Sequence, residues 1–472
     1  MEFISVFDVF KIGVGPSSSH TLGPWKAARS FMKDCIKKDL IQMTSTLKVS
    51  LFGSLSLTGK GHATDLAILM GLSDYDPETV DTEKIESIIF KIKDEHSIEV
   101  SNGKFLKFDP QHEIVFEKEF LSFHANGMVF TLKNENKPDF QETYYSIGGG
   151  FLIKENESDD EGAEIIKYPY PIDTSKQLMK YCEDYGLSIS EVVIANESVT
   201  HTKDEYETKL LKIWETMLDS IYVGCHTQGF LPGALAVKRR AAEVVHRLSP
   251  NLVYSDKNEW LQAIRTLNPT FNDIIKWVSS FGISVNEVNA AFGRVVTAPT
   301  NGSAGVIPAV LMYYLCFVNK EAGDEEIIKF LSTSAEIGSI FKKGSTISAA
   351  MGGCQAEIGV SSSMAAAGLS ELIGGSPEQC TIAAEIAMEH HLGMTCDPIG
   401  GLVQVPCIER NSMGAIKAIN AASIATDRNP KDVKVTLDQV IKTMWETAQD
   451  MNRKYKETSE GGLATAVNIV DC

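Results

Sequence analysis

The chain has 472 residues, of which 43% are hydrophobic and 22% charged; this is typical of a folded globular protein and excludes a disordered, collagen-like or disulfide-dense chain. Its 44 Lys and Arg residues against 62 Asp and Glu residues give a formal net charge of −18, so nucleic acid and anionic membrane surfaces are disfavoured as partners. At roughly 100–200 residues per domain, the length predicts about two to four domains.

The first third of the chain mixes helical and strand patterns. Apolar side chains recur at helical spacing over residues 24–38, and apolar and polar residues alternate over residues 47–51. Asn102 and Gly103, between two short apolar runs, predict a hairpin turn. A further helix is predicted at residues 62–70, and further strands at 97–100, 105–108, 113–116, 127–132 and 143–153. We therefore expect an α+β domain over residues 1–165.

An acidic segment separates this part from the rest of the chain. Residues 155–161 read ENESDDE, which is typical of a solvated loop, so Asp159 and Asp160 are not expected to be a catalytic pair. The alternating Tyr and Pro of residues 168–171 end any regular element. We place the domain boundary within residues 155–172 and divide the chain after residue 165.

The remainder, residues 166–472, is predicted to be an all-α domain. The predicted helices cover residues 203–223, 256–266, 271–281, 284–292, 327–341, 364–372, 377–391 and 437–458. Residues 302–318 form the longest weakly polar run, but Pro308 interrupts it, which favours a buried helix over a membrane span. The first residues lack the basic region of a signal peptide, so we expect a cytoplasmic protein.

The cysteines Cys354 and Cys407 stand directly beside Gly or Pro, and Cys396 lies two residues before Pro398. Cys354, Cys396 and Cys407 are spaced C-x41-C-x10-C, which matches neither a compact zinc pattern nor the tight cysteine run of ferredoxins. The neighbouring Gly or Pro predicts that each thiol lies at a turn or helix end, from which it can point to a shared centre. Three thiolates on a four-iron cluster would leave one iron free for substrate. The alternative interpretation is unrelated buried cysteines.

The chain ends on another cysteine, Cys472. The terminal segment is too apolar for a typical free tail, since it contains Val467 and Ile469, and it follows a flexible pair, Gly461 and Gly462. A terminal thiol on such a segment could reach an interior site. The alternative is an incidental cysteine at a frayed end.

Two histidines lie in Ser- or Gly-rich turns before predicted helices. The hydroxyls of Ser17 to Ser19 and the imidazole of His20 precede the helix that starts near residue 24, which suits recognition of a carboxylate or another anion. His62 follows Lys60, which lies between two glycines, and a neutral imidazole at a helix N-terminus can act as a base. Helix capping and structural histidines are the alternative interpretations.

Two further turns offer hydroxyl and amide groups. Residues 298–305 (APTNGSAG) precede an apolar helix whose free backbone N–H groups could bind a carboxylate. Residues 359–363 (GVSSS) present three more hydroxyls shortly after Cys354, and either segment could instead be a capping turn. The candidate substrate-binding residues are Ser17, Ser18, Ser19, Lys60, Thr300, Asn301, Gly302, Ser303, Ser361, Ser362 and Ser363.

Several long motifs, in a fixed order along the chain, resemble one enzyme family. They are FDVFKIGVGPSSSHTLGP, GKGHATD, APTNGSAGVIPAVL, GGCQAEIGVSSSMAAAGL, CDPIGGLVQVPCIERN and the terminal cysteine. Over nearly its whole length the sequence is similar to the single-chain, iron–sulfur-dependent L-serine dehydratases (L-serine ammonia-lyases) of bacteria. The resemblance implies an α+β domain related to a regulatory serine-binding module, followed by an all-α catalytic domain, in a homodimer.

The same resemblance implies a cofactor and its ligands. A [4Fe–4S] cluster is expected on Cys354, Cys396 and Cys407, with Cys472 occupying the fourth iron until the substrate displaces it. L-serine would lose the hydroxide on C3 to that iron and its α-proton to a base, giving pyruvate and ammonia. We expect the catalytic base to be His62 or His20, with the displaced Cys472 thiolate as a further candidate.

Three other interpretations stay open. Another cluster-dependent hydro-lyase would act on a small hydroxy acid, and a non-catalytic serine sensor would bind L-serine without turnover. A pyridoxal-phosphate enzyme needs a Schiff-base lysine and a Gly-rich phosphate loop. Lys343, beside Gly344 and Ser345, is a faint candidate for that lysine, and no matching Gly-rich loop accompanies it.

Overall fold

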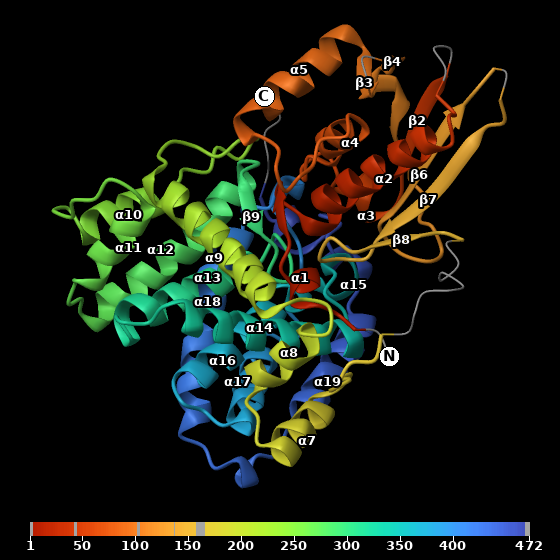
Figure 1. Ribbon diagram of the computed structural model, residues 1–472. Coiled ribbons are helices and arrows are strands. Elements are labelled where there is room, and N and C mark those ends of the chain that lie inside the picture. Colours follow the sequence, from red (N-terminus) through yellow and green to blue (C-terminus); the bar gives the residue numbers. More distant parts are fainter. Residues whose placement is uncertain (1–2, 42–44, 102–103, 136, 157–165, 468–472) are drawn as a thin grey trace.

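An α+β part and a larger helical part of the chain lie against each other in the computed structural model (Figure 1). The structure describes residues 3–41, 45–101, 104–135, 137–156 and 166–467. This order confirms the predicted fold class, an α+β region followed by a helical region. Among the described residues, the helices are all too short or too polar to span a bilayer.

A mixed five-stranded sheet forms the framework of the α+β part. Its strand order is β5-β2-β6-β7-β8, and β2 pairs in parallel with β5 and antiparallel with β6. Leu47 and Val49 of β2 are buried and the intervening Lys48 is exposed, as the alternating pattern predicts. The strands are β2 (Thr46–Leu51), β5 (Ile114–Phe116), β6 (Gly127–Lys133), β7 (Phe140–Ser146) and β8 (Leu152–Lys154).

Helices α2 and α4 pack together beside this sheet (Figure 1). Phe31 of α2 stacks on Phe130 of β6 with ring centroids 5.3 Å apart, which joins the helix layer to the sheet. Gly71 of α4 lets the two helices approach, because a Cβ there would lie 2.2 Å from the carbonyl oxygen of Trp25. The helices of this part are α1 (Val6–Val9), α2 (Gly23–Lys37), α3 (Ser54–Leu57), α4 (Thr64–Leu72), α5 (Ile85–Glu95) and α6 (Pro110–Glu113).

One part of the strand prediction is confirmed by the structure, and another part is wrong. The predicted hairpin is present as β3 (Ser97–Ser101) paired antiparallel with β4 (Lys104–Lys107), while Asn102 and Gly103 lie outside the described residues. The single strand predicted over residues 143–153 is wrong, because the chain turns between β7 and β8. Gly148 to Gly150 all have positive φ, which breaks a strand.

Helix α16 lies at the centre of the helical part and packs against α14, α17 and α18. Its sequence, IGVSSSMAAAGLSEL, is rich in small residues, and every residue from Ile358 to Ser370 is buried. The helices are α7 (Ser175–Tyr185), α8 (Ile189–Glu197), α9 (Lys203–His226), α10 (Ala241–Leu248), α11 (Lys257–Arg265), α12 (Phe271–Ala290), α13 (Val306–Tyr313), α14 (Asp324–Gly344), α15 (Ala349–Gly352), α16 (Ile358–Leu372), α17 (Pro377–Glu389), α18 (Cys407–Thr426) and α19 (Leu437–Asp450).

Two helix predictions in this part are wrong. Residues 271–281 and 284–292 were expected as two helices, but α12 runs through Gly282 without a break, and the backbone of α18 packs closely on that glycine. Residues 437–458 were expected as one helix, but α19 ends at Asp450 and Met451 is extended. The residues after Met451 instead return to pair with the loop around Cys396.

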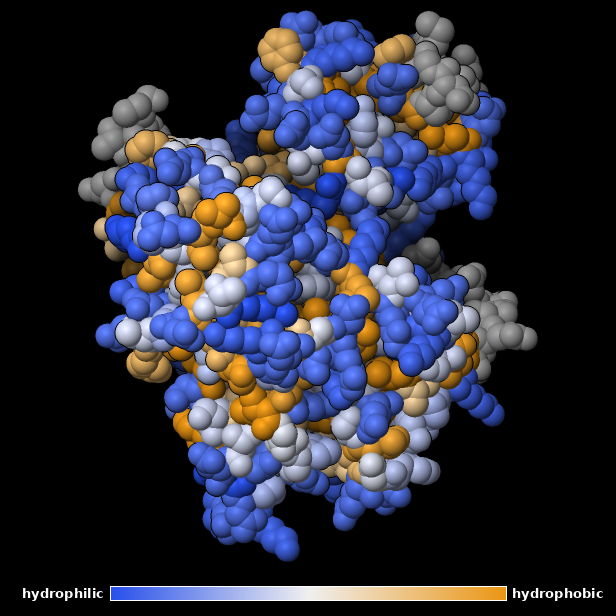
Figure 2. Space-filling model, turned by 60° about the vertical axis from the view of Figure 1, so that its left-hand side comes forward, coloured by the Kyte–Doolittle hydropathy of each residue, from blue (hydrophilic) through white to orange (hydrophobic). Residues whose placement is uncertain are grey.

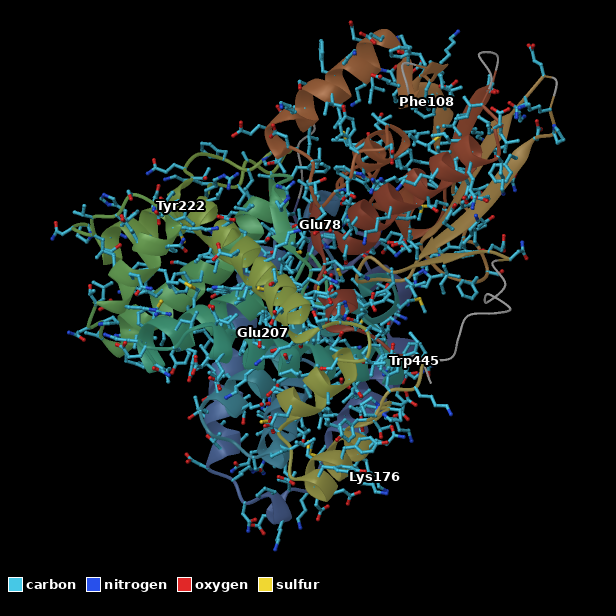
Figure 3. All side chains as sticks on the ribbon, in the orientation of Figure 1. Glu78, Phe108, Lys176, Glu207, Tyr222 and Trp445 are labelled. Atoms are coloured by element: carbon cyan, nitrogen blue, oxygen red, sulfur yellow. The ribbon has the colours of Figure 1, made fainter. Side chains whose placement is uncertain are left out.

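The first residues of the chain belong to both parts. Strand β1 (Ile12–Val14) pairs antiparallel with β9 (Arg294–Val296), and Val6 and Phe10 are buried in the core of the helical part. At the same junction, Nζ of Lys212 in α9 lies 2.8 Å from Oε1 of Glu78 in the α+β part. Figure 3 labels Glu78 at this junction. In the space-filling view the α+β part forms the smaller lobe, and an indentation separates it from the helical part (Figure 2).

Candidate active site

Three cysteines from separate segments of the helical part lie together. Cys354 lies in the turn Gly353–Ala356, Cys396 in the loop after α17, and Cys407 at the start of α18. All three are at most 7% exposed and free of disulfide bonds. The Sγ atoms of Cys354 and Cys396 and a carboxylate oxygen of Glu357 lie within 4.8 Å of one another, and Cys407 lines the same small cavity as Cys396. This set of soft and hard donors could hold a metal.

Backbone contacts fix the loops that carry two of these cysteines. The N–H of Cys396 donates to the carbonyl of Tyr455, and the N–H of Glu457 donates to the carbonyl of Cys396, both at 2.8 Å. Gly353 has a φ of 71°, which lets the chain turn immediately before Cys354. A side chain there would also lie 2.7 Å from a backbone oxygen, so the turn requires glycine.

Arg410, near the start of α18, brings a positive charge to the cysteines. Its Nη1 donates to the carbonyl of Thr395 at 2.7 Å, and its Nη2 lies 3.4 Å from Asp397. A hydrogen bond from Cys396, together with Arg410, outweighs burial and lowers the pKa of Cys354 to about 7. The surroundings therefore favour the thiolate form of Cys354, which is the form that binds metals.

Two histidines of the α+β part lie side by side, and one of them, His62, lines this cavity. The ring centroids of His20 and His62 are 4.6 Å apart, and both side chains are buried. His20 contacts Ser19 Oγ through Nδ1 at 2.9 Å and Ser54 Oγ through Nε2 at 3.0 Å. His62 donates from Nδ1 to the carbonyl of Thr58 at 2.9 Å, because a carbonyl oxygen only accepts. This bond leaves Nε2 of His62 available as a proton acceptor when the ring is neutral.

Glu457 lies between the two histidines. Its Oε1 is 3.5 Å from Nδ1 of His20 and 3.4 Å from Nε2 of His62. Burial opposes the ionisation of Glu457, but the two histidines outweigh burial and hold its pKa below the usual 4.5. Burial lowers the pKa of His20 to about 4. Near neutral pH, Glu457 is therefore ionised and His20 is uncharged.

The loop that precedes α13 contributes another side of the cavity. Gly302 lines the cavity, and Thr300 Oγ1 donates to Oε1 of Glu357 at 2.7 Å. Asn301 Nδ2 donates to the carbonyl of Gly15 at 2.7 Å, which ties this loop to the turn that carries His20. A Cβ at Gly302 would lie 2.9 Å from Glu357 Oε1, so glycine allows this close approach. Burial, reinforced by Cys354, raises the pKa of Glu357 well above 4.5.

Comparison with known proteins assigns the chain to a family. Residues 184–464 match the family described as serine dehydratase alpha chain, and residues 5–157 match the family described as serine dehydratase beta chain. The chain belongs to the serine dehydratase family.

Bacterial serine dehydratases resemble this chain over almost their full length. The L-serine dehydratase of Haemophilus influenzae is 47% identical over 466 residues, which cover 98% of this chain and 99% of that protein. L-serine dehydratase 2 of Escherichia coli is 47% identical over 470 residues, covering 99% of this chain and 100% of that protein. L-serine dehydratase 1 of Escherichia coli is 46% identical over 465 residues, covering 98% of this chain and 99% of that protein.

Of the four predicted substrate-binding residues in the N-terminal part of this serine dehydratase fold, one lines the cavity, two are buried in a helical turn and one is exposed. Ser17 lines the cavity, and its Oγ accepts from the backbone N–H of His20 at 3.1 Å. Ser18 and Ser19 are buried in the π-helical turn Ser18–Leu22. Lys60 is exposed, and its Nζ lies 5.5 Å from the ring centroid of an aromatic neighbour. The structure brings Ser17 to the cavity and leaves Lys60 at the surface.

The hydroxyls of the helical part mostly contact backbone carbonyls. Ser303 Oγ lies 3.0 Å from the hydroxyl of Thr300 and donates to the carbonyl of residue 298 at 3.1 Å. Ser361 donates to the carbonyl of Ser303 at 3.3 Å. Ser362 donates to a carbonyl of α18 at 2.8 Å, and Ser363 to a carbonyl within α16 at 3.0 Å. The role of these hydroxyls in substrate binding stays a prediction.

Three charged residues at this serine dehydratase site were missed by the sequence analysis. Glu357 and Arg410 each follow a cysteine of the site by three residues, and this spacing on a helix could have indicated them. Glu457 had no such signal, because its partners lie in distant segments of the chain. Cys472, which was predicted to reach the site, lies outside the described residues.

Proposed function

We propose that this protein is an L-serine dehydratase that converts L-serine into pyruvate and ammonia. The observation that carries the proposal is the meeting of Cys396, Cys407 and His62 at one cavity, with Cys354 close to Cys396, in a chain of the serine dehydratase family. Relatives that bear the name L-serine dehydratase are 41–47% identical and extend over almost the whole chain.

We assign an α+β domain to residues 1–165 and a helical catalytic domain to residues 166–472. The distribution of sheet and helix supports this division. The α+β domain is proposed to complete the active site, since His62 of that domain and Cys396 of the helical domain line one cavity. A regulatory role for the same domain is compatible with this arrangement.

The donor set of the cavity fits a [4Fe–4S] cluster. Cys354, Cys396 and Cys407 would hold it, because thiolates are the ligands that such clusters prefer and Arg410 offsets their negative charge. Cys472 is proposed as the ligand of the fourth iron at rest. When bound, the cluster would supply a Lewis acid that assists departure of the hydroxyl group.

His62 is the side chain best suited to remove the α-proton. Thr58 holds its Nδ1–H, so Nε2 is the atom that receives the proton. Oε1 of Glu457, 3.4 Å away, stabilises the positive charge that His62 then carries. Both ring nitrogens of His20 already contact hydroxyls at 3.0 Å or less, which favours an orienting role for His20.

The remaining chemistry follows from loss of the proton and the hydroxide. The C–H electron pair forms the double bond between C2 and C3 as hydroxide leaves C3. The product aminoacrylate tautomerises to an imine, and water hydrolyses the imine to pyruvate and ammonia. Ser17 and the loop of residues 300–303 are proposed to hold the substrate carboxylate, because their hydroxyl and backbone N–H groups lie at or beside the cavity.

We also propose a cytoplasmic homodimer. All eight described cysteines are free, as expected in a reducing compartment. Apolar side chains of α12 and α18 line a surface groove of about 480 Å³, and Phe271 beside it is 76% exposed, which offers a second copy a surface to cover. Sedimentation equilibrium should give twice the chain mass of 51.7 kDa.

The test is pyruvate formation from L-serine by anaerobically purified protein, followed by brief exposure to air. We expect activity with brown protein and loss of both together in air. Activity that survives in colourless protein would contradict the assignment of an iron–sulfur cluster. If brown protein does not convert L-serine but converts a small hydroxy acid, that acid replaces L-serine as the proposed substrate. If brown protein binds L-serine without turnover, the protein is a sensor.

A further inference from the structure

Glu457 lines the cavity and has a carboxylate oxygen with no hydrogen-bond partner in the part of the chain that the structure describes. The side chain is 4% exposed and lines the cavity together with His62 and Cys396. Its Oε1 is shared between His20 and His62, whereas its Oε2 is buried and has no hydrogen-bond partner among the described residues. A buried carboxylate oxygen left in this state is costly, so a ligand that donates to it gains binding energy.

The charges around the cavity indicate what kind of ligand that is. Among the described residues that line it there is no Lys or Arg, and Glu457 supplies the carboxylate whose Oε2 has no partner. Arg410 is turned to Thr395, Asp397 and the cysteines instead. The cavity therefore favours a cationic group as the partner of Glu457.

The position of Glu457 relative to His62, the proposed base, indicates which cationic group of the substrate would contact Glu457. In L-serine the ammonium group and the proton to be removed are attached to the same carbon. Nε2 of His62, which receives the proton, is 3.4 Å from one oxygen of Glu457, and the unpartnered oxygen belongs to the same carboxylate. A substrate that presents its α-proton to His62 thus brings its ammonium group beside Oε2.

The backbone holds Glu457 firmly in this place. Its N–H donates to the carbonyl of Cys396 at 2.8 Å, and its C=O accepts from Ser54 Oγ at 2.7 Å and from Thr58 Oγ1 at 3.4 Å. Its φ of 57° is left-handed, a conformation that a non-glycine residue adopts only where its surroundings impose it. Three contacts to both parts of the molecule thus position one carboxylate.

We propose that Glu457 is the residue that recognises the α-ammonium group of the substrate, through Oε2, and so selects amino acids over hydroxy acids. This inference rests on the proposed function. It explains why a site with an electrophilic metal, which could act on many hydroxy acids, would accept L-serine.

The test compares two ligands that differ by the amino group. 3-Hydroxypropionate keeps the carboxylate and the C3 hydroxyl of L-serine and lacks the ammonium group. In Glu457→Gln holoenzyme the KM for L-serine should rise by about 10- to 100-fold, because a charge-assisted bond is lost. The inhibition constant of 3-hydroxypropionate should stay within about threefold or improve, because that ligand places no cation at Oε2.

Controls separate recognition from other roles of Glu457. Glu460→Gln removes a carboxylate three residues away, which lies 3.7 Å from Arg453, and should leave both constants unchanged. Iron content and absorbance of Glu457→Gln should match the wild-type protein. Glu457→Asp should recover part of the affinity for L-serine.

Several outcomes overturn the inference. They are a KM for L-serine within threefold of the wild-type value, an equal change in both constants, or a fall in kcat alone, which would leave Glu457 as a partner of His62 only. If 3-hydroxypropionate binds neither form measurably, the KM alone decides. Wild-type holoenzyme that makes no pyruvate from L-serine would instead refute the proposed function, a result distinct from all of these.

Discussion

The two sides of the cavity are held in different ways. On the histidine wall, formed by His20 and His62 of the α+β part, three of the four ring nitrogens contact side-chain or backbone oxygens at 3.0 Å or less. On the cysteine wall, formed by Cys354, Cys396 and Cys407 of the helical part, the thiols interact with one another, with Arg410 and with Glu357. The chain itself therefore fixes the histidine wall, whereas the cysteine wall offers its thiols as donors for the proposed cluster.

The largest expected effect tests the cysteine wall. Cys396→Ser should remove the bound iron and abolish pyruvate formation, a loss of more than about 10³-fold, because a hydroxyl is a poor ligand for a metal held by thiolates. Iron analysis and visible absorbance measure this directly. Cys182→Ala, a buried cysteine of α7 in the same helical part, is the matched control and should keep the iron. Full iron content in Cys396→Ser would contradict the assignment.

A smaller loss is expected on the histidine wall, without loss of iron. His62→Ala should lower kcat by about 10²–10⁴-fold, because the α-proton then has no acceptor, while the visible absorbance stays that of the wild-type protein. His20→Ala should lower kcat by less, since His20 is proposed to orient its neighbours. Near-normal turnover in His62→Ala with an intact cluster would remove His62 from the role of base.

The pH dependence of stability tests a histidine outside both walls. Burial lowers the pKa of His391 to about 4, so the unfolded chain binds its proton more readily than the folded chain does. The free energy of unfolding should therefore be insensitive to this residue above pH 6.5 and should fall by roughly 3 kcal/mol as the pH drops towards 4. Anaerobic urea unfolding at several pH values measures the slope. His391→Gln should flatten it, and an unchanged slope would rule out this histidine as the cause.

The smallest effect is expected for a hydroxyl that holds helices together. Ser362 donates to a carbonyl of α18 at 2.8 Å and is fully buried in α16. Ser362→Ala should lower the free energy of unfolding by about 1 kcal/mol and leave the KM for L-serine unchanged. Steady-state kinetics measures the KM, and urea unfolding measures the free energy of unfolding. A KM that rises severalfold would instead support the prediction that Ser362 binds substrate.

Local patterns predicted much of the fold. The alternation over residues 47–51 and the helical spacing over residues 24–38 correspond to β2 and α2, because each pattern reports burial of one face. The failures lie where long-range packing overrides the local pattern. Gly282 remains inside α12 because its lack of a side chain allows the backbone of α18 to approach closely. The residues after Asp450 leave the helical conformation because they pair with the distant Cys396 loop.

Long-range contacts also limit how much of the site can be predicted from the sequence. Cys354, Cys396 and His62 stood out because Gly or Pro near them indicated turns, and the structure brings all three to one region. Glu457 could not be found this way. Its environment is made by His20 and Ser54, from the other end of the chain, and such contacts leave no local signature in sequence.

The hydrogen bond from Ser54 to the carbonyl of Glu457 has a consequence for biosynthesis. It joins residues 403 positions apart, so the cavity is incomplete until the segment that carries Glu457 has left the ribosome. Domains generally fold in the order of their synthesis, and the sheet around β2 can form long before the segment that carries Glu457 exists. The site is therefore assembled late, and the proposed cluster can enter its complete site only in a chain that already extends to residue 457.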